Sequence, residues 1–270
     1  MKIDAEVHFW KFDKLRGNGY IRNNKILNQD YLPEQILQNL QRNSIDGCIA
    51  VVFDDSEVET RFLSELATTH PEVYAVIGWL DLYDPKATDK IREFQQYVPV
   101  RGYRIEFENE REPSAAVMEL LQENQYSLDF TILHGMNTNS IGNWLSAYPN
   151  QEFILQKGGN PETDRAPTSA WENQIRELAK NQNLSCKLTG LLTGGSNLKS
   201  WSPKDFYPFL DILFDSFGAD RLLFASDWPF MLLAGIYVQW KSLVEKFMEK
   251  YTADDRDKIF GENARRLYRI

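Results

Sequence analysis

The sequence predicts an α/β fold, a single (β/α)8 TIM barrel that spans residues 1–270 as one domain. Segments with strand character alternate with helix patterns from end to end, and eight strands can be counted. A barrel of this type needs roughly 250 residues, which the chain provides. A doubly wound open sheet is the alternative, but it usually has a glycine-rich first turn, which is absent here.

Each expected strand is a short apolar run bounded by polar or turn residues. The strands are expected at 3–8, 47–53, 73–82, 100–107, 128–134, 152–157, 184–191 and 221–227. Helices are expected near 33–40, 56–70, 115–122, 141–148, 169–181, 203–217 and 237–251, with a short helix at the end of the chain. The segment 56–59 has the spacing of a capping box, which marks the start of its helix.

The composition narrows the kind of partner. Lys and Arg number 30 and Asp and Glu 39, which gives a net charge of −9. An acidic surface argues against nucleic acid and anionic membranes, so we expect a small-molecule substrate, with a homo-oligomer possible. Cys48 and Cys186 lie in apolar runs and are expected to be buried and unpaired. The N-terminus shows no secretory h-region and no apolar run approaches ~20 residues, which together predict a cytoplasmic protein.

Polar side chains gather at the expected C-terminal ends of the strands, where this fold places its chemistry. Residues two apart in a strand face the same way, so Asp4, Glu6 and His8 are expected to share one face. The last strand ends at Asp227, immediately before Trp228-Pro229, and Asp227 is the strongest catalytic candidate.

Further charged and imidazole groups follow the same logic. The fourth strand offers Arg104, the fifth ends on His134 and the sixth ends on Lys157. Such a mixture of carboxylates, imidazoles and cations can deprotonate water and stabilise an oxyanion. Lys187 lies in the middle of its strand, and we expect it to face the helices with a solvated stem.

Several motifs, in order along nearly the whole chain, carry a resemblance to a known family. They are Ile3-Asp4-Ala5-Glu6-Val7-His8-Phe9-Trp10, the segments 58–63 and 77–82, Gly102-Tyr103-Arg104, the segment 186–191, Ala225-Ser226-Asp227-Trp228-Pro229 and the segment 263–268. The chain thereby resembles the amidohydrolase superfamily, in its amidohydrolase-2 group with sugar lactonases of the L-fuconolactonase and L-rhamnonolactonase kind. The resemblance implies a barrel hydrolase of carbohydrate metabolism.

The chain departs from the family pattern at three histidines. Glu6 stands at the first position of the usual His-x-His, Lys157 replaces a ligand histidine after the sixth strand, and Ile105 follows Arg104 where histidine is frequent. The expected cofactor is therefore none or one divalent metal, zinc or manganese. If a metal is present, Glu6, His8, His134 and Asp227 are its expected ligands, as a mixed imidazole and carboxylate set.

The resemblance, together with these departures from it, implies three alternative functions. The first is hydrolysis of a sugar-derived lactone, in which Asp227 is the general base, Lys157 stabilises the oxyanion, His8 positions water or the leaving group, and Glu6 pairs with Lys157. Arg104, Trp79, His134 and Trp228 are expected to contact substrate. The second is a metal-dependent decarboxylase or hydratase acting on a carboxylated substrate. The third is a non-catalytic binding protein with a decayed site.

Overall fold

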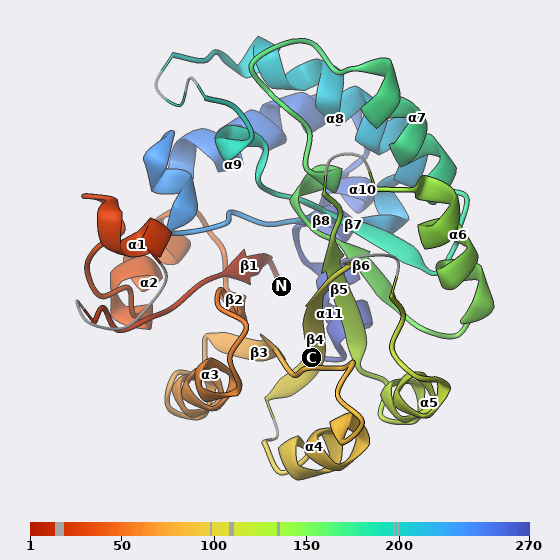
Figure 1. Ribbon diagram of the computed structural model, residues 1–270. Coiled ribbons are helices and arrows are strands. Elements are labelled where there is room, and N and C mark those ends of the chain that lie inside the picture. Colours follow the sequence, from red (N-terminus) through yellow and green to blue (C-terminus); the bar gives the residue numbers. More distant parts are fainter. Residues whose placement is uncertain (14–18, 98, 108–110, 134–135, 197, 199) are drawn as a thin grey trace.

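Eight parallel strands form the centre of the computed structural model, and helices surround them (Figure 1). The structure describes residues 1–270 apart from 14–18, 98, 108–110, 134–135, 197 and 199. The strands pair in sequence order, and a parallel bridge between Val7 and Trp228 joins the segment after the last strand to the first strand. The predicted barrel is confirmed.

The strands are shorter than the apolar runs that predicted them, because the ends of these runs form the loops at the barrel mouth. The strands are β1 (Ile3–Val7), β2 (Gly47–Val51), β3 (Val73–Gly78), β4 (Val100–Glu106), β5 (Ser127–Thr131), β6 (Phe153–Leu155), β7 (Leu184–Leu188) and β8 (Leu222–Phe224). Most described positions of these strands are buried, as expected when side chains pack on both faces of a parallel sheet.

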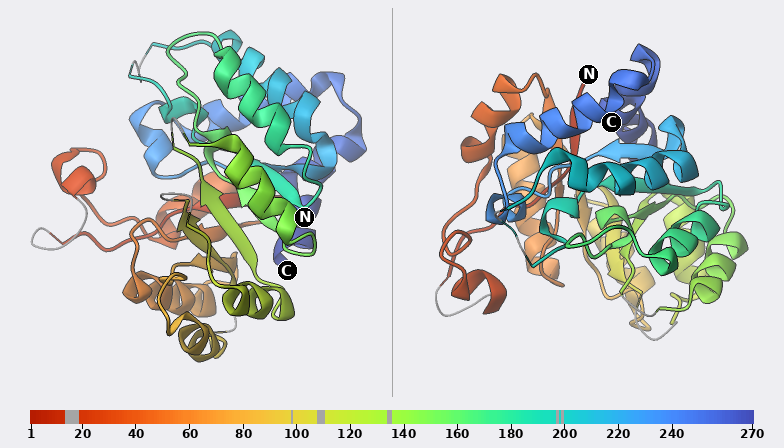
Figure 2. Two further views of the ribbon diagram at one scale, coloured as in Figure 1. Left: turned by 45° about the vertical axis from the view of Figure 1, so that its right-hand side comes forward. Right: turned by 90° about the horizontal axis from the view of Figure 1, so that it is seen from above.

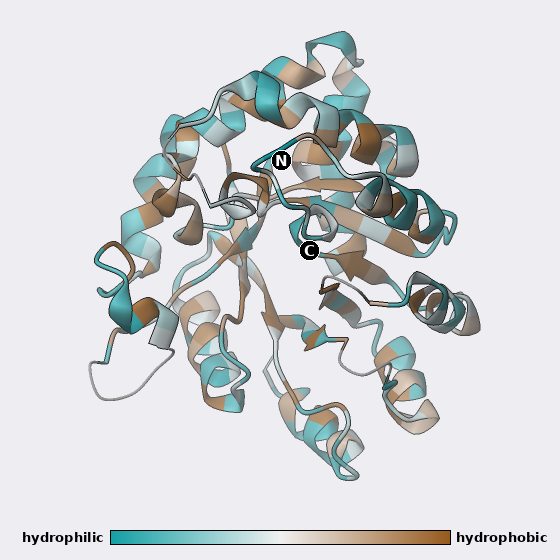
Figure 3. Ribbon diagram, turned by 45° about the horizontal axis from the view of Figure 1, so that its top comes forward, coloured by the Kyte–Doolittle hydropathy of each residue, from teal (hydrophilic) through white to brown (hydrophobic). Residues whose placement is uncertain are grey.

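The helices lie around the strands and combine apolar with hydrophilic residues (Figure 3). The residues that the longer helices bury are mostly apolar. The helices are α1 (Gly19–Asn23), α2 (Pro33–Arg42), α3 (Glu57–Thr69), α4 (Ala87–Phe94), α5 (Ala115–Glu123), α6 (Thr138–Ala147), α7 (Ser169–Leu178), α8 (Pro203–Phe217), α9 (Tyr237–Phe247), α10 (Ala253–Asp257) and α11 (Asn263–Tyr268). The sequence reading missed α1 and α4. Among the described residues, no helix is both long and apolar enough to cross a membrane.

A small apolar cluster fills the barrel. It consists of alternate strand residues, such as Ile49, Val51 and Leu223, together with Leu267 and Tyr268 of α11. The backbone carbonyl of Met1 lies against Gly261, so the C-terminal helices cover the end of the barrel at which β1 starts. Figure 2 shows both chain ends on this side. The opposite end, where the strands finish, remains available for a site.

An irregularity in β1 corrects one expectation from the sequence. The pairing of β1 with β2 shifts register between Asp4 and Val7. Ala5 belongs to the cluster inside the barrel, whereas the Asp4 carboxylate contacts the hydroxyl of Tyr237 on α9, 3.0 Å away. Asp4 therefore does not share a face with Glu6 and His8, because a β-bulge changes the strict alternation of side chains.

Candidate active site

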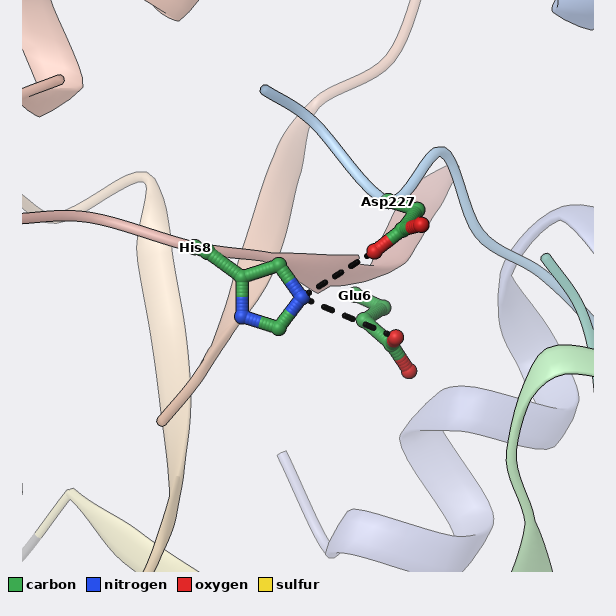
Figure 4. A group of neighbouring side chains, drawn as sticks. All are labelled: Glu6, His8 and Asp227. Atoms are coloured by element: carbon green, nitrogen blue, oxygen red, sulfur yellow. Dashed lines mark hydrogen bonds and ion pairs between the residues drawn. The ribbon is translucent and has the colours of Figure 1, made fainter. Parts of the chain in front are cut away.

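Three side chains meet where β1 and β8 end (Figure 4). The His8 Nε2 atom lies 3.2 Å from Asp227 Oδ1 and 3.7 Å from Glu6 Oε1. Each of the three residues is at most 3% exposed. The structure thus brings together Glu6, His8 and Asp227, which the sequence proposed as catalytic residues or ligands.

The backbone of β2 orients the imidazole of His8. The His8 Nδ1 atom lies 2.8 Å from the carbonyl oxygen of Val51, which can only accept, so Nδ1 carries a hydrogen and donates it. This contact directs Nε2 toward the two carboxylates. Burial alone would lower the pKa of His8, but hydrogen bonds to Asp227 and Glu6 outweigh it and raise the pKa to about 9.

Hydrogen bonds between β1 and the segment after β8 hold the site together. The backbone N–H of Asp227 donates to the carbonyl of Glu6 at 3.1 Å, and that of His8 donates to the carbonyl of Trp228 at 2.8 Å. Asp227 has a φ of +60°, in the left-handed region that residues other than glycine seldom adopt. Backbone strain of this kind is concentrated at functional sites.

A buried ion-pair network lies beneath the site and corrects the expectation for Lys187. Its side chain is fully buried inside the barrel, with Nζ 3.0 Å from Glu6 Oε2 and 2.7 Å from Asp129 Oδ2. It is not a solvated stem facing the helices, because Lys187 pairs with Leu223, whose side chain belongs to the cluster inside the barrel. Glu6 therefore pairs with Lys187, and the expected pairing with Lys157 is not seen.

Lys187 and His8 determine the ionisation state of Glu6. Burial alone would raise the pKa of Glu6, but the Lys187 ammonium and His8 hold it well below its usual value. On the other side of the ammonium, Asp129 accepts a hydrogen bond from the hydroxyl of Tyr268 at 3.0 Å. Gln156 donates to Glu6 Oε2 at 3.4 Å. One Glu6 oxygen is thus held by this network, and the other faces His8.

The three side chains form the floor of a cavity of about 390 Å³. Two cationic residues and three aromatic residues line it, together with polar and apolar side chains: Glu6, His8, Tyr20, Phe53, Arg104, Glu106, Thr131, Leu133, Gln156, Lys157, Asn160, Thr193, Asp227, Phe230 and Leu233. Phe53 and Phe230 pack together, with ring centroids 4.6 Å apart, and Phe230 also contacts the ring of His8. The cavity is large enough for a single sugar ring and combines an apolar wall with charged groups.

The remaining candidate residues differ in whether they line the cavity. Arg104 and Lys157 line the cavity, and Arg104 donates to the carbonyl of Val52 at 2.9 Å. Trp79 and Trp228 are not among the described lining residues, so their contact with substrate stays a prediction that this geometry does not support. His134 lies outside the described residues.

Sequence reasoning missed Asp129 and Tyr268 and misplaced Lys187. A signal was present, because Asp129 and Lys187 are charged residues in the middle of apolar strands. Two opposite charges in such positions point to a buried pair, since a buried charge without a partner is too costly. The sequence does not give the distance between β5 and β7, the strands that carry Asp129 and Lys187.

The donor atoms fit a single divalent metal ion. One ligand atom from each of Glu6, His8 and Asp227 lies within 4.8 Å of the others. With Nδ1 committed to Val51, the Nε2 atom of a neutral His8 would present its lone pair to the metal, which is the usual orientation of a ligand histidine. Glu6, His8 and Asp227 could therefore bind a metal.

Comparisons with known proteins agree with the fold and show the family. A family model described as amidohydrolase matches residues 3–270. The chain is 30% identical to an L-fucono-1,5-lactonase of Burkholderia multivorans, over 100% of this chain and 96% of the relative, and 26% identical to an L-fucono-1,5-lactonase of Burkholderia ambifaria with the same coverage. A crystal structure of a B. multivorans amidohydrolase with bound zinc is 28% identical, with a TM-score of 0.88 over 100% of this chain and 99% of that one.

Proposed function

The chain belongs to the amidohydrolase family, and we propose that it hydrolyses a sugar-derived lactone in the cavity above Glu6, His8 and Asp227. The observation that carries the proposal is the buried contact of Asp227 with His8 at the floor of this cavity. Full-length similarity to two proteins named L-fucono-1,5-lactonase supports the choice of substrate class.

Hydrolysis requires a base for water and a donor for the leaving group. Asp227 takes a proton from water, and the water oxygen forms a bond to the lactone carbonyl carbon. The ring C–O bond then breaks, and the ring oxygen leaves as a hydroxyl after it receives a proton. In the site without a metal, His8 lies within hydrogen-bond distance of Asp227 and is positioned to pass that proton to the ring oxygen. With a metal held at the Nε2 atom of His8, Asp227 itself would return the proton. The product is the open-chain hydroxy acid.

Cationic groups at the cavity wall stabilise the charge that develops on the carbonyl oxygen. Lys157 and Arg104 line the cavity and are the groups assigned to this role. Fixed positive charge in a site that excludes water lowers the barrier more than the same charge in bulk water. A divalent metal held by Glu6, His8 and Asp227 would act as a Lewis acid toward the same oxygen, with zinc as the proposed ion.

The aromatic wall suits a lactone with an apolar edge. Phe53, Phe230 and Tyr20 line the cavity together and offer no charged group to a sugar hydroxyl. A 6-deoxy sugar lactone, such as the substrate in the names of the two relatives, carries a methyl group that could pack here. We therefore propose 6-deoxy lactones as better substrates than their hydroxymethyl counterparts.

A panel assay tests this function. A pH indicator would report acid release from five- and six-membered sugar lactones, with L-fucono-1,5-lactone and its hydroxymethyl counterpart L-galactono-1,5-lactone as a matched pair. We expect saturable hydrolysis with a higher kcat/KM for the deoxy compound. Turnover of carboxylated aromatic compounds in place of lactones would establish a decarboxylase or hydratase, and tight binding of sugar acids without any turnover would establish a binding protein.

A further inference from the structure

A buried carboxylate behind the barrel wall joins the two segments that carry the site. Asp4 is fully buried and lies on the outer side of β1, away from the cavity. Its Oδ1 atom accepts hydrogen bonds from the backbone N–H of Ser226 at 2.9 Å and of Glu6 at 3.3 Å. One oxygen thus contacts both Glu6 and the residue before Asp227.

The first helix residue after the site loop fixes the other oxygen of this carboxylate. The hydroxyl of Tyr237, at the start of α9, donates to Asp4 Oδ2 at 3.0 Å. The indole N–H of Trp240, one turn later, donates to the carbonyl of Ala225 at 2.8 Å. The segment 225–228 is therefore held from the outside by α9 and from the side by β1.

The contacts of Asp4 point to a role for this residue beyond stability. A bulge displaces Glu6 toward the site, and the left-handed conformation of Asp227 is strained. Neither geometry is the default of an isolated strand, so contacts must impose both. Asp4 accepts hydrogen bonds from the backbone N–H of Glu6 and of Ser226, the residue before Asp227.

We propose that Asp4, fixed by Tyr237, is a positioning residue that sets the separation of Glu6 and Asp227 and thereby both turnover and metal affinity. Of these two effects, only the effect on turnover rests on the proposed function. Small displacements of catalytic groups are costly, since productive geometry must be held within about 0.5 Å. Asp4 itself touches neither the cavity nor substrate.

Three substitutions separate positioning from stability. Asp4→Ala removes both acceptor oxygens. Asp4→Asn keeps one oxygen for Ser226, and its amide can donate to the Tyr237 hydroxyl, so it is the conservative rescue. Tyr237→Phe removes only the hydroxyl. Leu178→Ala, in the fully buried core of α7, is the control that lowers stability at a distance from the site.

We expect the loss of the Asp4 carboxylate to lower kcat and zinc affinity while KM stays nearly unchanged. Asp4→Ala should lower kcat by about 10- to 100-fold with KM within twofold, and should weaken zinc binding, measured by competition with a chromophoric chelator, by about tenfold. Tyr237→Phe should lower kcat about threefold. Asp4→Asn should stay within threefold of wild type in both measurements, and Leu178→Ala should change neither at a temperature where it remains folded.

Other outcomes overturn the inference. Wild-type kcat and zinc affinity in folded Asp4→Ala would show that the contacts do not position the site. If Asp4→Ala fails to fold, unchanged constants in Tyr237→Phe decide against it. Zinc affinity does not depend on lactone hydrolysis, so a wild-type protein without turnover would refute the proposed function while the zinc measurement still tests Asp4.

Discussion

At the scale of single residues, the two lysines near the site have different roles. Lys187 is fully buried between Glu6 and Asp129, whereas Lys157 lines the cavity. A buried cation between two carboxyl groups favours their charged forms and orients them. A cation on a cavity wall can instead meet charge that develops on a substrate. The sequence reading gave the charge pairing with Glu6 to the wrong lysine.

Substitution of each lysine by methionine separates these roles. Lys187→Met leaves two buried carboxylates without their counter-charge, and we expect the free energy of unfolding to fall by about 3–5 kcal/mol. Lys157→Met should leave the free energy of unfolding within about 0.5 kcal/mol and lower kcat for lactone hydrolysis at least tenfold. Chemical denaturation and steady-state kinetics on both proteins provide the check, and exchanged effects would contradict this assignment.

At the scale of elements, the loop after β2 depends on a carboxyl group from α3. Glu59 accepts the backbone N–H groups of Phe53 and Asp54 at 2.8 and 2.7 Å. Phe53 is part of the aromatic wall, and the next residue but one, Asp55, lies 3.7 Å from Arg104. The start of α3 therefore orders one side of the cavity through the carboxyl group of Glu59, whose pKa depends on burial.

Burial raises the pKa of Glu59 to about 7, against the lowering effect of its two backbone hydrogen bonds. The unfolded chain loses this proton near its usual value of 4.5, so between pH 4.5 and 7 the folded state binds more protons. The free energy of unfolding should therefore fall as pH rises through this window, by up to roughly 3 kcal/mol from this group. Glu59→Gln should remove that dependence.

Urea denaturation of wild type and Glu59→Gln at pH 5, 6 and 7 measures the effect. The variant should gain stability relative to wild type as the pH rises. If the free energy of unfolding of the two proteins changed with pH in the same way, the Glu59 carboxyl would ionise in the folded protein as it does in the unfolded chain.

At the scale of the whole molecule, the sequence predicted the barrel and the location of the site. Eight apolar runs separated by helix patterns were sufficient for the fold, because burial on both sheet faces leaves a strong local signal. His8 and Asp227 were found because they end predicted strands, and Glu6 was found because it lies two residues before His8. The short helix α4 was missed, although its residues 87–94 bury Ala87, Ile91 and Phe94 at helical spacing.

The remaining errors come from contacts between distant segments. The alternation of side chains placed Asp4 on the same face as Glu6 and His8, and only the bulge between Asp4 and Val7 shows otherwise. The partner of Glu6 depends on how β1 and β7 face each other across the barrel, which local patterns do not encode. The fold was therefore easier to predict than the charge network within it.

The central claim is that Asp227 acts on a sugar lactone, and the most direct test compares wild type with Asp227→Asn. Initial rates of L-fucono-1,5-lactone hydrolysis would be measured for both proteins, with metal content determined on the same samples. We expect saturable turnover for wild type and a loss of about 10³-fold or more in kcat for the variant, with unchanged circular dichroism. Equal rates for the two proteins, or a wild-type rate no faster than spontaneous hydrolysis, would contradict the account.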